Sequence, residues 1–185
     1  VYGSDIPIAC VGVISKVNMV FMAICIGISQ GSQPIWGFNY GAKKYDRVRQ
    51  AYRYSVTACT VIATIFFFCF QIFPHQIVGI FGTGSELYFQ FAERYLKIFM
   101  FMTFVNGIQP VSSSFFTSIG MAKLGIVMSL TRQVIFLLPL IIIFPLFMGI
   151  DGVMYAGPIA DAAAFALAIV FARRELGKMR SAEIV

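Results

Sequence analysis

The stretch IFLLPLIIIFPLFMGI, residues 135–150, contains no polar side chain. Strands of a membrane β-barrel alternate polar and apolar residues over about ten positions, and this stretch does not alternate at all. In the hydrocarbon core of a bilayer the backbone must satisfy its own hydrogen bonds, which a helix does within one segment. The stretch therefore predicts a membrane-spanning helix and disfavours a β-barrel.

The composition of the whole chain agrees with this prediction. Of its 185 residues, 59% are hydrophobic and 12% are charged, which is about half the charged fraction of a typical soluble domain. The mean hydropathy is +0.83. The net charge is +6, but the cations lie between apolar runs and not on one basic face, so we expect no nucleic-acid partner. A soluble fold is excluded, and the expected surroundings are a lipid bilayer.

Five apolar runs are long enough to cross a bilayer, which takes roughly 20 helical residues. They cover residues 6–32, 54–73, 98–122, 124–150 and 152–172. The predicted fold is all-α and polytopic, with five transmembrane helices and a tail over residues 173–185. Pro139 and Pro145 are expected to kink or weaken the fourth span.

An amphipathic segment precedes the third span. In residues 85–97, SELYFQFAERYLK, the apolar Leu87, Phe91 and Tyr95 recur at helical spacing, and Glu93 and Arg94 fall on the other side. Such a segment is typical of a helix that lies at the membrane interface, here leading into the third span.

The breaks between the spans differ in positive charge. With five spans, the first break, the third break and the tail lie on one side of the membrane. These three regions carry nine Lys and Arg residues, against two on the opposite side. Cytoplasmic loops carry the excess of Lys and Arg, so the tail is expected in the cytoplasm and the N-terminus outside.

The third span carries a polar stripe. Asn106, Gln109, Ser113 and Thr117 follow one another at helical spacing, within a sector roughly 80° wide at about 100° per residue. One hypothesis is a helix that lines a cavity for substrate or a coupling cation. The alternative is packing, in which hydroxyls and amides bridge neighbouring helices.

The other candidates lie on the first and last spans. A second stripe contains Asn18 and Met22, followed by Cys25 and Ser29. Asp161 is the only acid within a span, and three roles are open for it: a proton or cation site, the partner of a buried cation, or a structural hydrogen-bond acceptor. Arg132, close to the cytoplasmic end of the fourth span, is expected to reach the lipid headgroups.

The sequence contains no constellation typical of an enzyme. His75 is the only histidine, and no GxxxxGK[ST] motif for nucleotide phosphates is present. No metal-ligand cluster is recognisable, and no cofactor is expected apart from a coupling ion. The chain is therefore not expected to be an enzyme.

The segment GISQGSQPIWGFNYGAKKYDRVRQ, residues 27–50, resembles a signature of the MATE (multidrug and toxic compound extrusion) family. The shared pattern is Gly-x-x-Gln-Gly-x-Gln-Pro-x-x-Gly-x-Asn-x-Gly-Ala, followed by a basic loop. Its positions here include Gln30, Gln33, Pro34, Gly37, Asn39 and Gly41. The pieces AERYLKIF (92–99) and PIAD (158–161) also resemble the second lobe of that family.

The resemblance implies helices eight to twelve of a twelve-helix protein that has two six-helix lobes. The seventh helix and the first lobe would belong to the same polypeptide outside this sequence. The motif around Pro34 is expected to form a structural turn in which the first helix breaks, with Gln33 and Asn39 bonding to freed backbone groups. A bacterial cytoplasmic membrane is the expected location.

By resemblance, the expected function is export of drugs or cationic amphipathic metabolites by antiport with Na⁺ or H⁺. The two lobes would alternate access to a central cavity. Two alternatives remain open: a related flippase for a lipid-linked precursor, and a membrane subunit that does not transport. A flippase would have a strongly cationic cavity, and a subunit would need no polar stripes.

Overall fold

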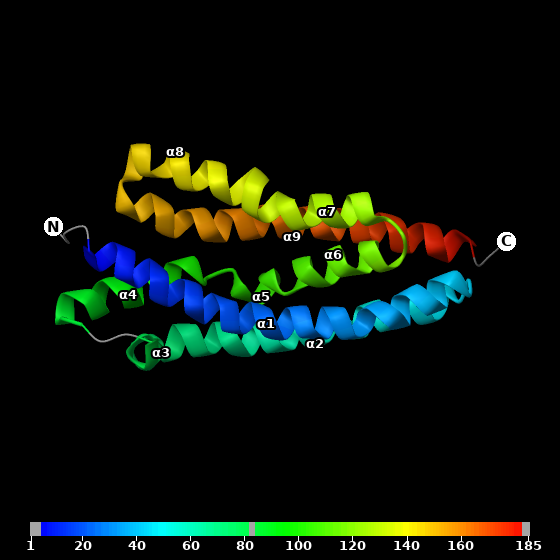
Figure 1. Cartoon of the computed structure of the whole chain (residues 1–185), viewed down its shortest axis with the longest axis horizontal. Coiled ribbons are helices and arrows are strands. Elements are labelled where there is room, and N and C mark those ends of the chain that lie inside the picture. Colours follow the sequence, from blue (N-terminus) through cyan, green and yellow to red (C-terminus); the bar gives the residue numbers. More distant parts are fainter. Residues whose placement is uncertain (1–4, 82–83, 183–185) are drawn as a thin grey trace.

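The computed structural model describes residues 5–81 and 84–182, and within them the chain is helical throughout (Figure 1). The elements are α1 (Asp5–Gly41), α2 (Tyr45–Ile72), α3 (Pro74–Phe81), α4 (Glu86–Phe99), α5 (Thr103–Asn106), α6 (Ile108–Ser118), α7 (Ala122–Leu130), the π-helical η1 (Thr131–Leu137), α8 (Leu138–Met148) and α9 (Ile150–Ala182). The long helices lie side by side in an elongated bundle, with α1 and α2 on one side and α8 and α9 on the other.

Four helical stretches within the described residues are long and apolar enough to cross a membrane: Ile6–Gly41, Tyr45–Ile72, Ala122–Met148 and Asp151–Ser181. They correspond to the predicted first, second, fourth and fifth spans. The all-helical membrane prediction is thereby confirmed. The third predicted span differs, because it is broken into short helices.

Helix α1 does not break at Pro34, so the predicted turn over Gln30, Gln33, Pro34, Gly37, Asn39 and Gly41 is wrong. These residues form the last three turns of α1, and the chain turns after Gly41, where Lys43 has φ 57°. Asn39 donates from its Nδ2 to the carbonyl of Ile35 at 2.7 Å, within the helix. A proline in a helix removes one backbone bond, but tertiary packing can hold such a helix straight through.

That packing centres on Trp36, which is fully buried. Its ring meets Phe115 of α6 edge-on, with centroids 5.6 Å apart, and lies 6.3 Å from the ring of Tyr52 on α2. At Gly37 an added Cβ would lie 3.3 Å from the backbone oxygen of Ser118, so the glycine permits close approach of α1 and α6. The family-like motif therefore joins three helices.

The third predicted span, residues 98–122, is not one helix. α4, α5 and α6 follow one another along the bundle, separated by breaks at residues 100–102 and at Gly107 (Figure 1). At Gly107 an added Cβ would lie 3.2 Å from the backbone oxygen of Cys59 and 3.4 Å from the Sγ of Cys25. The second break therefore lies where three segments approach closely.

The amphipathic segment over residues 85–97 is confirmed as a helix, α4. Its N-cap is Ser85, whose Oγ accepts from the backbone N–H of Tyr88. Its buried face contains Tyr88, Phe91, Ala92, Tyr95 and Leu96, and Leu87 is 39% exposed. This face packs against α1 and α9. The helix is thus part of the bundle and begins the same path that α5 and α6 continue.

The fourth predicted span is helical from Ala122 to Met148 but changes its winding. Residues Thr131–Leu137 are π-helical, and Pro139 lies in the first turn of α8. A proline ring clashes with the carbonyl four residues earlier, and a wider turn before it relieves that clash. The predicted perturbation by Pro139 is therefore found one turn upstream of the proline.

Helix α9 continues beyond the predicted end of the fifth span. It runs to Ala182, so most of the predicted tail is helical, and residues 183–185 lie outside the described part of the chain. Every fourth residue of one face is a buried alanine: Ala156, Ala160, Ala164, Ala168 and Ala172. Small side chains at this spacing let neighbouring backbones approach closely.

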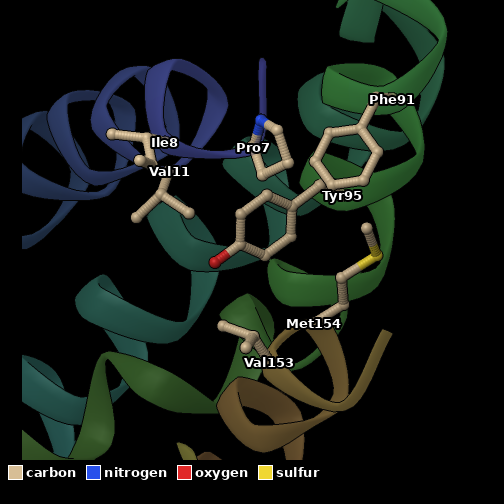
Figure 2. A pocket seen from close by; sticks show the side chains of 7 residues that line it. All are labelled: Pro7, Ile8, Val11, Phe91, Tyr95, Val153 and Met154. Carbon is tan, nitrogen blue, oxygen red and sulfur yellow. The ribbon is translucent and has the colours of Figure 1, made fainter. Parts of the chain in front are cut away.

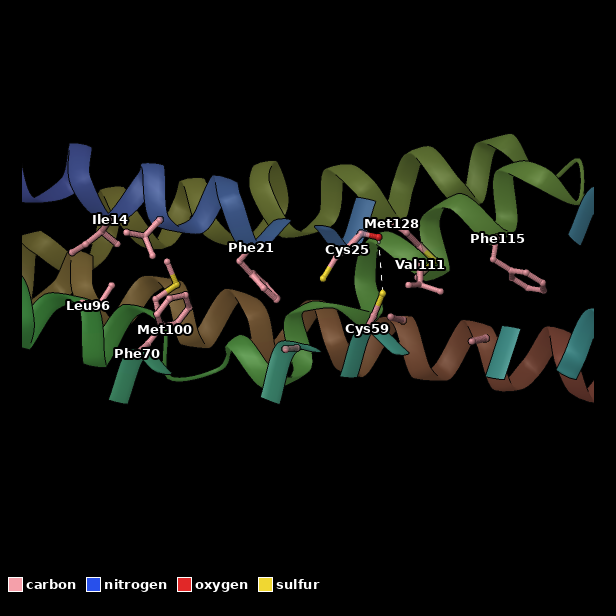
Figure 3. Packing of buried hydrophobic residues seen from close by; sticks show 14 of the residues in the cluster. Ile14, Phe21, Cys25, Cys59, Phe70, Leu96, Met100, Val111, Phe115 and Met128 are labelled. Carbon is pink, nitrogen blue, oxygen red and sulfur yellow. Dashed lines mark hydrogen bonds between the residues drawn. The ribbon is translucent and has the colours of Figure 1, made fainter. Parts of the chain in front are cut away.

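The buried residues form one continuous cluster along the bundle, shared by α1, α2, α4, α6 and α9 (Figure 3). In the middle of the bundle Cys59 of α2 lies with its Sγ 3.9 Å from the backbone oxygen of Cys25 on α1. None of the described residues of α8 is buried. The exposed side of α8 is thus available for contact with lipid or with other helices.

Candidate functional site

A buried ion pair lies in the interior of the bundle. The Nε of Arg132, on η1, donates to Oδ1 of Asp161, on α9, at 2.5 Å. The side chains of Arg132 and Asp161 are 7% and 4% exposed. Asn106, the last residue of α5, donates from its Nδ2 to the other carboxylate oxygen at 3.2 Å.

This triad corrects the prediction for Arg132. The side chain does not reach the end of the bundle, because it points inward onto the carboxylate of Asp161. A buried charge without a partner is costly, so each of these two groups requires the other. The π-helical winding of residues Thr131–Leu137 and the break after Asn106 both lie at this triad. Asp161 therefore accepts hydrogen bonds from Arg132 and Asn106, which is the geometry expected of the partner of a buried cation. Its role as a proton or cation site stays a prediction.

A cavity of about 250 Å³ opens next to the triad, between α1, α6, α7 and η1. Its lining is Met22, Ile26, Gln109, Pro110, Ser113, Ser114, Ser129, Arg132 and Gln133. Amides, hydroxyls and one guanidinium thus face apolar side chains of α1. This mixture suits an amphipathic small molecule, since ligand sites combine apolar walls with a few polar groups.

Two of the polar lining residues also bond to the next helix. Gln109 donates from Nε2 to the backbone oxygen of Met128 at 2.8 Å, and Ser113 donates from Oγ to the backbone oxygen of Gly125 at 2.8 Å. At Gly125 an added Cβ would lie 2.9 Å from the backbone oxygen of Ser113. Ser113 therefore offers only its hydroxyl oxygen as an acceptor, whereas Gln109 keeps its Oε1 acceptor and one N–H donor for a ligand.

The structure brings together only part of the predicted stripes. Met22, Gln109 and Ser113 line the cavity. Asn106 contacts Asp161 behind it. Thr117 is exposed and donates to the carbonyl of Ser113 within its own helix.

Asn18 is not among the residues that line this cavity. Its Oδ1 is buried without a hydrogen-bond partner among the described residues. Further along α1, the hydroxyl of Ser29 is buried and donates to the carbonyl of Cys25. The backbone oxygen of Cys25 in turn lies 3.9 Å from Sγ of Cys59 on α2, and neither Cys25 nor Ser29 lines the cavity.

Three polar residues of the cavity were not predicted from the sequence: Ser114, Ser129 and Gln133. Arg132 and Gln133 follow Ser129 by three and four residues, which is the spacing of one helix face. In the fourth span, that spacing could have indicated a polar helix face. Ser114 gave no such signal, because it lies beside the stripe of Ser113.

A second hollow, of about 230 Å³, lies near the opposite end of the bundle (Figure 2). Pro7, Ile8 and Val11 of α1 face Phe91 and Tyr95 of α4, with Val153 and Met154 of α9 completing the wall. The lining is apolar except for the Tyr95 hydroxyl. This hollow can contact an apolar group, but its lining has no set of polar groups that would orient a ligand.

The fold and the cavity define a class: a multi-pass helical membrane protein with a polar cavity and a buried ion pair between its helices. A family model described as MatE matches residues 1–149. The chain therefore belongs to the MATE family of transporters, which confirms the resemblance found in its sequence, and it is not an enzyme.

Two relatives and two solved structures are similar to this chain. The multidrug export protein MepA of Staphylococcus aureus (strain bovine RF122 / ET3-1) is 23% identical over 186 residues, 100% of this chain and 40% of that protein. An uncharacterised protein, MG447, of Mycoplasma genitalium (strain ATCC 33530 / DSM 19775 / NCTC 10195 / G37) is 25% identical over 134 residues, 72% of this chain and 24% of that protein.

The MATE multidrug transporter DinF-BH, solved in complex with a ligand, is 35% identical with a TM-score of 0.83; the match covers 94% of this chain and 39% of that one. An outward-facing multidrug resistance MATE family transporter of the MOP superfamily is 16% identical with a TM-score of 0.89, over 97% of this chain and 41% of that one. The second likeness shows the shared fold alone. The chain thus spans about 40% of the MepA relative and of both solved chains.

Proposed function

We propose that the chain is part of the C-terminal lobe of a secondary active exporter, which moves drugs or cationic amphipathic metabolites out of the cell in exchange for Na⁺ or H⁺. A first lobe and a seventh helix of the same polypeptide would complete the central cavity, and the two lobes would alternate access to it. The coupling ion remains either Na⁺ or H⁺ in this proposal.

The observation that carries the proposal is the cavity beside Arg132. This cavity lies between α1, α6, α7 and η1. In its lining the apolar side chains of Met22 and Ile26 are combined with amide and hydroxyl groups. Arg132 is neutralised by Asp161, so the cavity does not carry a strong positive charge. This disfavours the flippase alternative, which needs a cationic cavity for its anionic cargo. A non-transporting subunit would not need a polar cavity.

The proposed path of the chain has five crossings. α4, α5 and α6 together form the third crossing, in addition to the four long apolar stretches. The turn after α1, the turn between α6 and α7 and the C-terminal end then gather at one end of the bundle (Figure 1). Those are the three regions rich in Lys and Arg, and we place this end in the cytoplasm and the N-terminus outside.

Labelling of introduced cysteines tests this orientation. On a background without Cys10, Cys25, Cys59 and Cys69, we expect a cysteine at His75 to react with an impermeant thiol reagent in intact cells. A cysteine at Lys43 should react only after lysis. Both side chains are exposed, so accessibility alone does not separate them. The reverse pattern would place the N-terminus in the cytoplasm.

The export proposal is tested at Gln133, which lines the cavity with an exposed side chain. In the two-lobe polypeptide, Gln133→Leu should raise the KM for efflux of a fluorescent cationic dye about 2- to 10-fold, the effect of one lost hydrogen bond. The amount of protein in the membrane should stay the same. Gln90→Leu is the matched control, since Gln90 is exposed on α4, away from the cavity.

Gln109→Leu gives a contrasting result, because its amide also holds α7 through the oxygen of Met128. We expect both efflux and protein abundance to fall. If Gln133→Leu and Gln90→Leu affect efflux equally, the cavity does not contact the substrate.

A further inference from the structure

A cationic pocket lies at the end of the bundle where α1 turns into α2. It is about 660 Å³ in volume and is lined by Asp46, Arg49, Gln50, Arg53, Tyr54 and Arg180. Five of these residues come from the first turns of α2, and Arg180 comes from the last turns of α9. Two segments more than 120 residues apart in sequence thus combine their arginines in one hollow.

Among the described residues, the charge of this pocket is only partly neutralised. Arg49 forms an ion pair with Asp46. Arg53 and Arg180 have exposed side chains, and no ion pair to either is present among the described residues. The pocket therefore carries an excess of guanidinium groups, which suit the planar, bidentate recognition of a phosphate.

A groove of about 520 Å³ adjoins the pocket, and Gln50 and Tyr54 belong to the walls of both. The side chain of Gln50 donates to the Tyr54 hydroxyl at 3.0 Å, so these two residues form one continuous border. Beyond this border the groove runs between α1 and α2. Its lining combines the apolar Ile28, Ile35, Ala51 and Ala58 with the polar Ser32, Asn39, Arg47 and Ser55. Its walls are more apolar than those of the pocket.

The dimensions of the pair of hollows match a lipid. From Asp46 in the pocket to Ala58 in the groove, α2 advances about 18 Å at 1.5 Å per residue. Half of the hydrocarbon core of a bilayer is about 15 Å thick. Tyr54, 67% exposed, stands at the junction, the depth at which tyrosines are enriched at membrane interfaces.

We propose that this pocket and groove bind one anionic phospholipid, with the phosphate held by Arg53 and Arg180 and one acyl chain lying in the groove between α1 and α2. The bound lipid would link the start of α2 to the end of α9. The site is separate from the cavity beside Arg132, and the proposal requires only that the chain lies in a bilayer with this groove between α1 and α2 facing lipid. Its failure would leave the export proposal unaffected, and the reverse also holds.

The test measures lipid retention by native mass spectrometry of the purified protein in detergent, with phosphatidylglycerol or phosphatidylcholine added. We expect a selective one-lipid complex with phosphatidylglycerol. Each arginine near a membrane surface contributes about 1 kcal/mol, which is roughly a fivefold change in affinity. Arg53→Gln together with Arg180→Gln should therefore weaken phosphatidylglycerol binding about 25-fold.

The matched control removes two cations at the same end of the bundle but outside the pocket, by Lys123→Gln with Arg173→Gln. It should leave lipid binding unchanged. Ala58→Phe should fill the groove and weaken phosphatidylglycerol binding, but leave the weak binding of free glycerol phosphate unaltered. Thermal unfolding in detergent without added lipid checks that each variant is folded.

Three results would overturn the proposal. Equal binding of phosphatidylcholine would show that the arginines do not select an anionic headgroup. An equal loss in the control variant would show a general effect of surface charge. Displacement of phosphatidylglycerol by glycerol phosphate at equal concentration would show that the groove holds no acyl chain.

Discussion

Arg132→Leu is expected to lower the free energy of unfolding by about 3–5 kcal/mol, the range for removal of one partner from a buried ion pair. The carboxylate of Asp161, 4% exposed, would retain only the Asn106 amide at 3.2 Å. A buried charge with one neutral donor is poorly compensated. Fluorescence-detected size exclusion after solubilisation should show a loss of most monodisperse protein, and the melting temperature should fall.

The double variant Arg132→Leu with Asp161→Leu separates a lost ion pair from a packing defect. It leaves no unpaired charge, so we expect much of the lost abundance to return. Arg94→Leu is the matched control. It removes an exposed ion pair with Asp151, whose Nη2 to Oδ2 distance is 3.3 Å, and such pairs contribute at most about 1 kcal/mol.

Asp161→Asn decides between the structural and the coupling role of this acid. If the pair is structural, the variant leaves Arg132 buried without its anion, and abundance falls in parallel with efflux. Normal abundance with efflux that has lost or shifted its dependence on pH would contradict the structural role. Asp161 would then be the site at which the coupling ion acts.

Expression of the 185-residue chain without a first lobe is expected to give membrane insertion but no drug resistance. In the proposed exporter a first lobe completes the central cavity, and alternating access requires a second body that moves against this one. The exposed apolar face of α8, on which Phe147 is 83% exposed, has the character of a surface for lipid or further helices. Minimum inhibitory concentrations and dye efflux provide the measurement.

Co-expression of the chain with a first lobe is the positive arm of this experiment, and the empty vector is the negative one. We expect efflux only when both lobes are present. Resistance from the chain alone, at the level of a two-lobe polypeptide, would refute the requirement for two lobes. Immunoblots of membrane fractions show in each case that the chain is present.

The sequence by itself determined the class of the protein and the positions of most spans. Residues 135–150 are apolar at every position, and burial in lipid depends on the composition of a segment rather than on its neighbours. The cations likewise fall in three parts of the sequence, at residues 43–49, 123 and 173–180. The turn after α1, the turn between α6 and α7 and the end of α9, next to which they lie, gather at one end of the bundle (Figure 1). The amphipathic period of residues 85–97 likewise predicted a helix correctly.

Local signals failed where contacts between distant segments decide the structure. Pro34 predicts a break, but α1 continues because Trp36 packs between Tyr52 and Phe115. The apolar run over residues 98–122 predicts one helix, but it is broken at Gly107, where Cys25 and Cys59 approach. Neither contact can be read from the residues next to the proline or the glycine.

The candidate site depends most on the tertiary structure. Arg132 and Asp161 are 29 residues apart, and the sequence of neither span identifies the other residue as its partner. Only the packing of η1 against α9 makes them partners. A charged side chain within a membrane protein usually faces its counter-charge. Which counter-charge it meets depends on which helix faces pack together, and the sequence of one span does not contain that information.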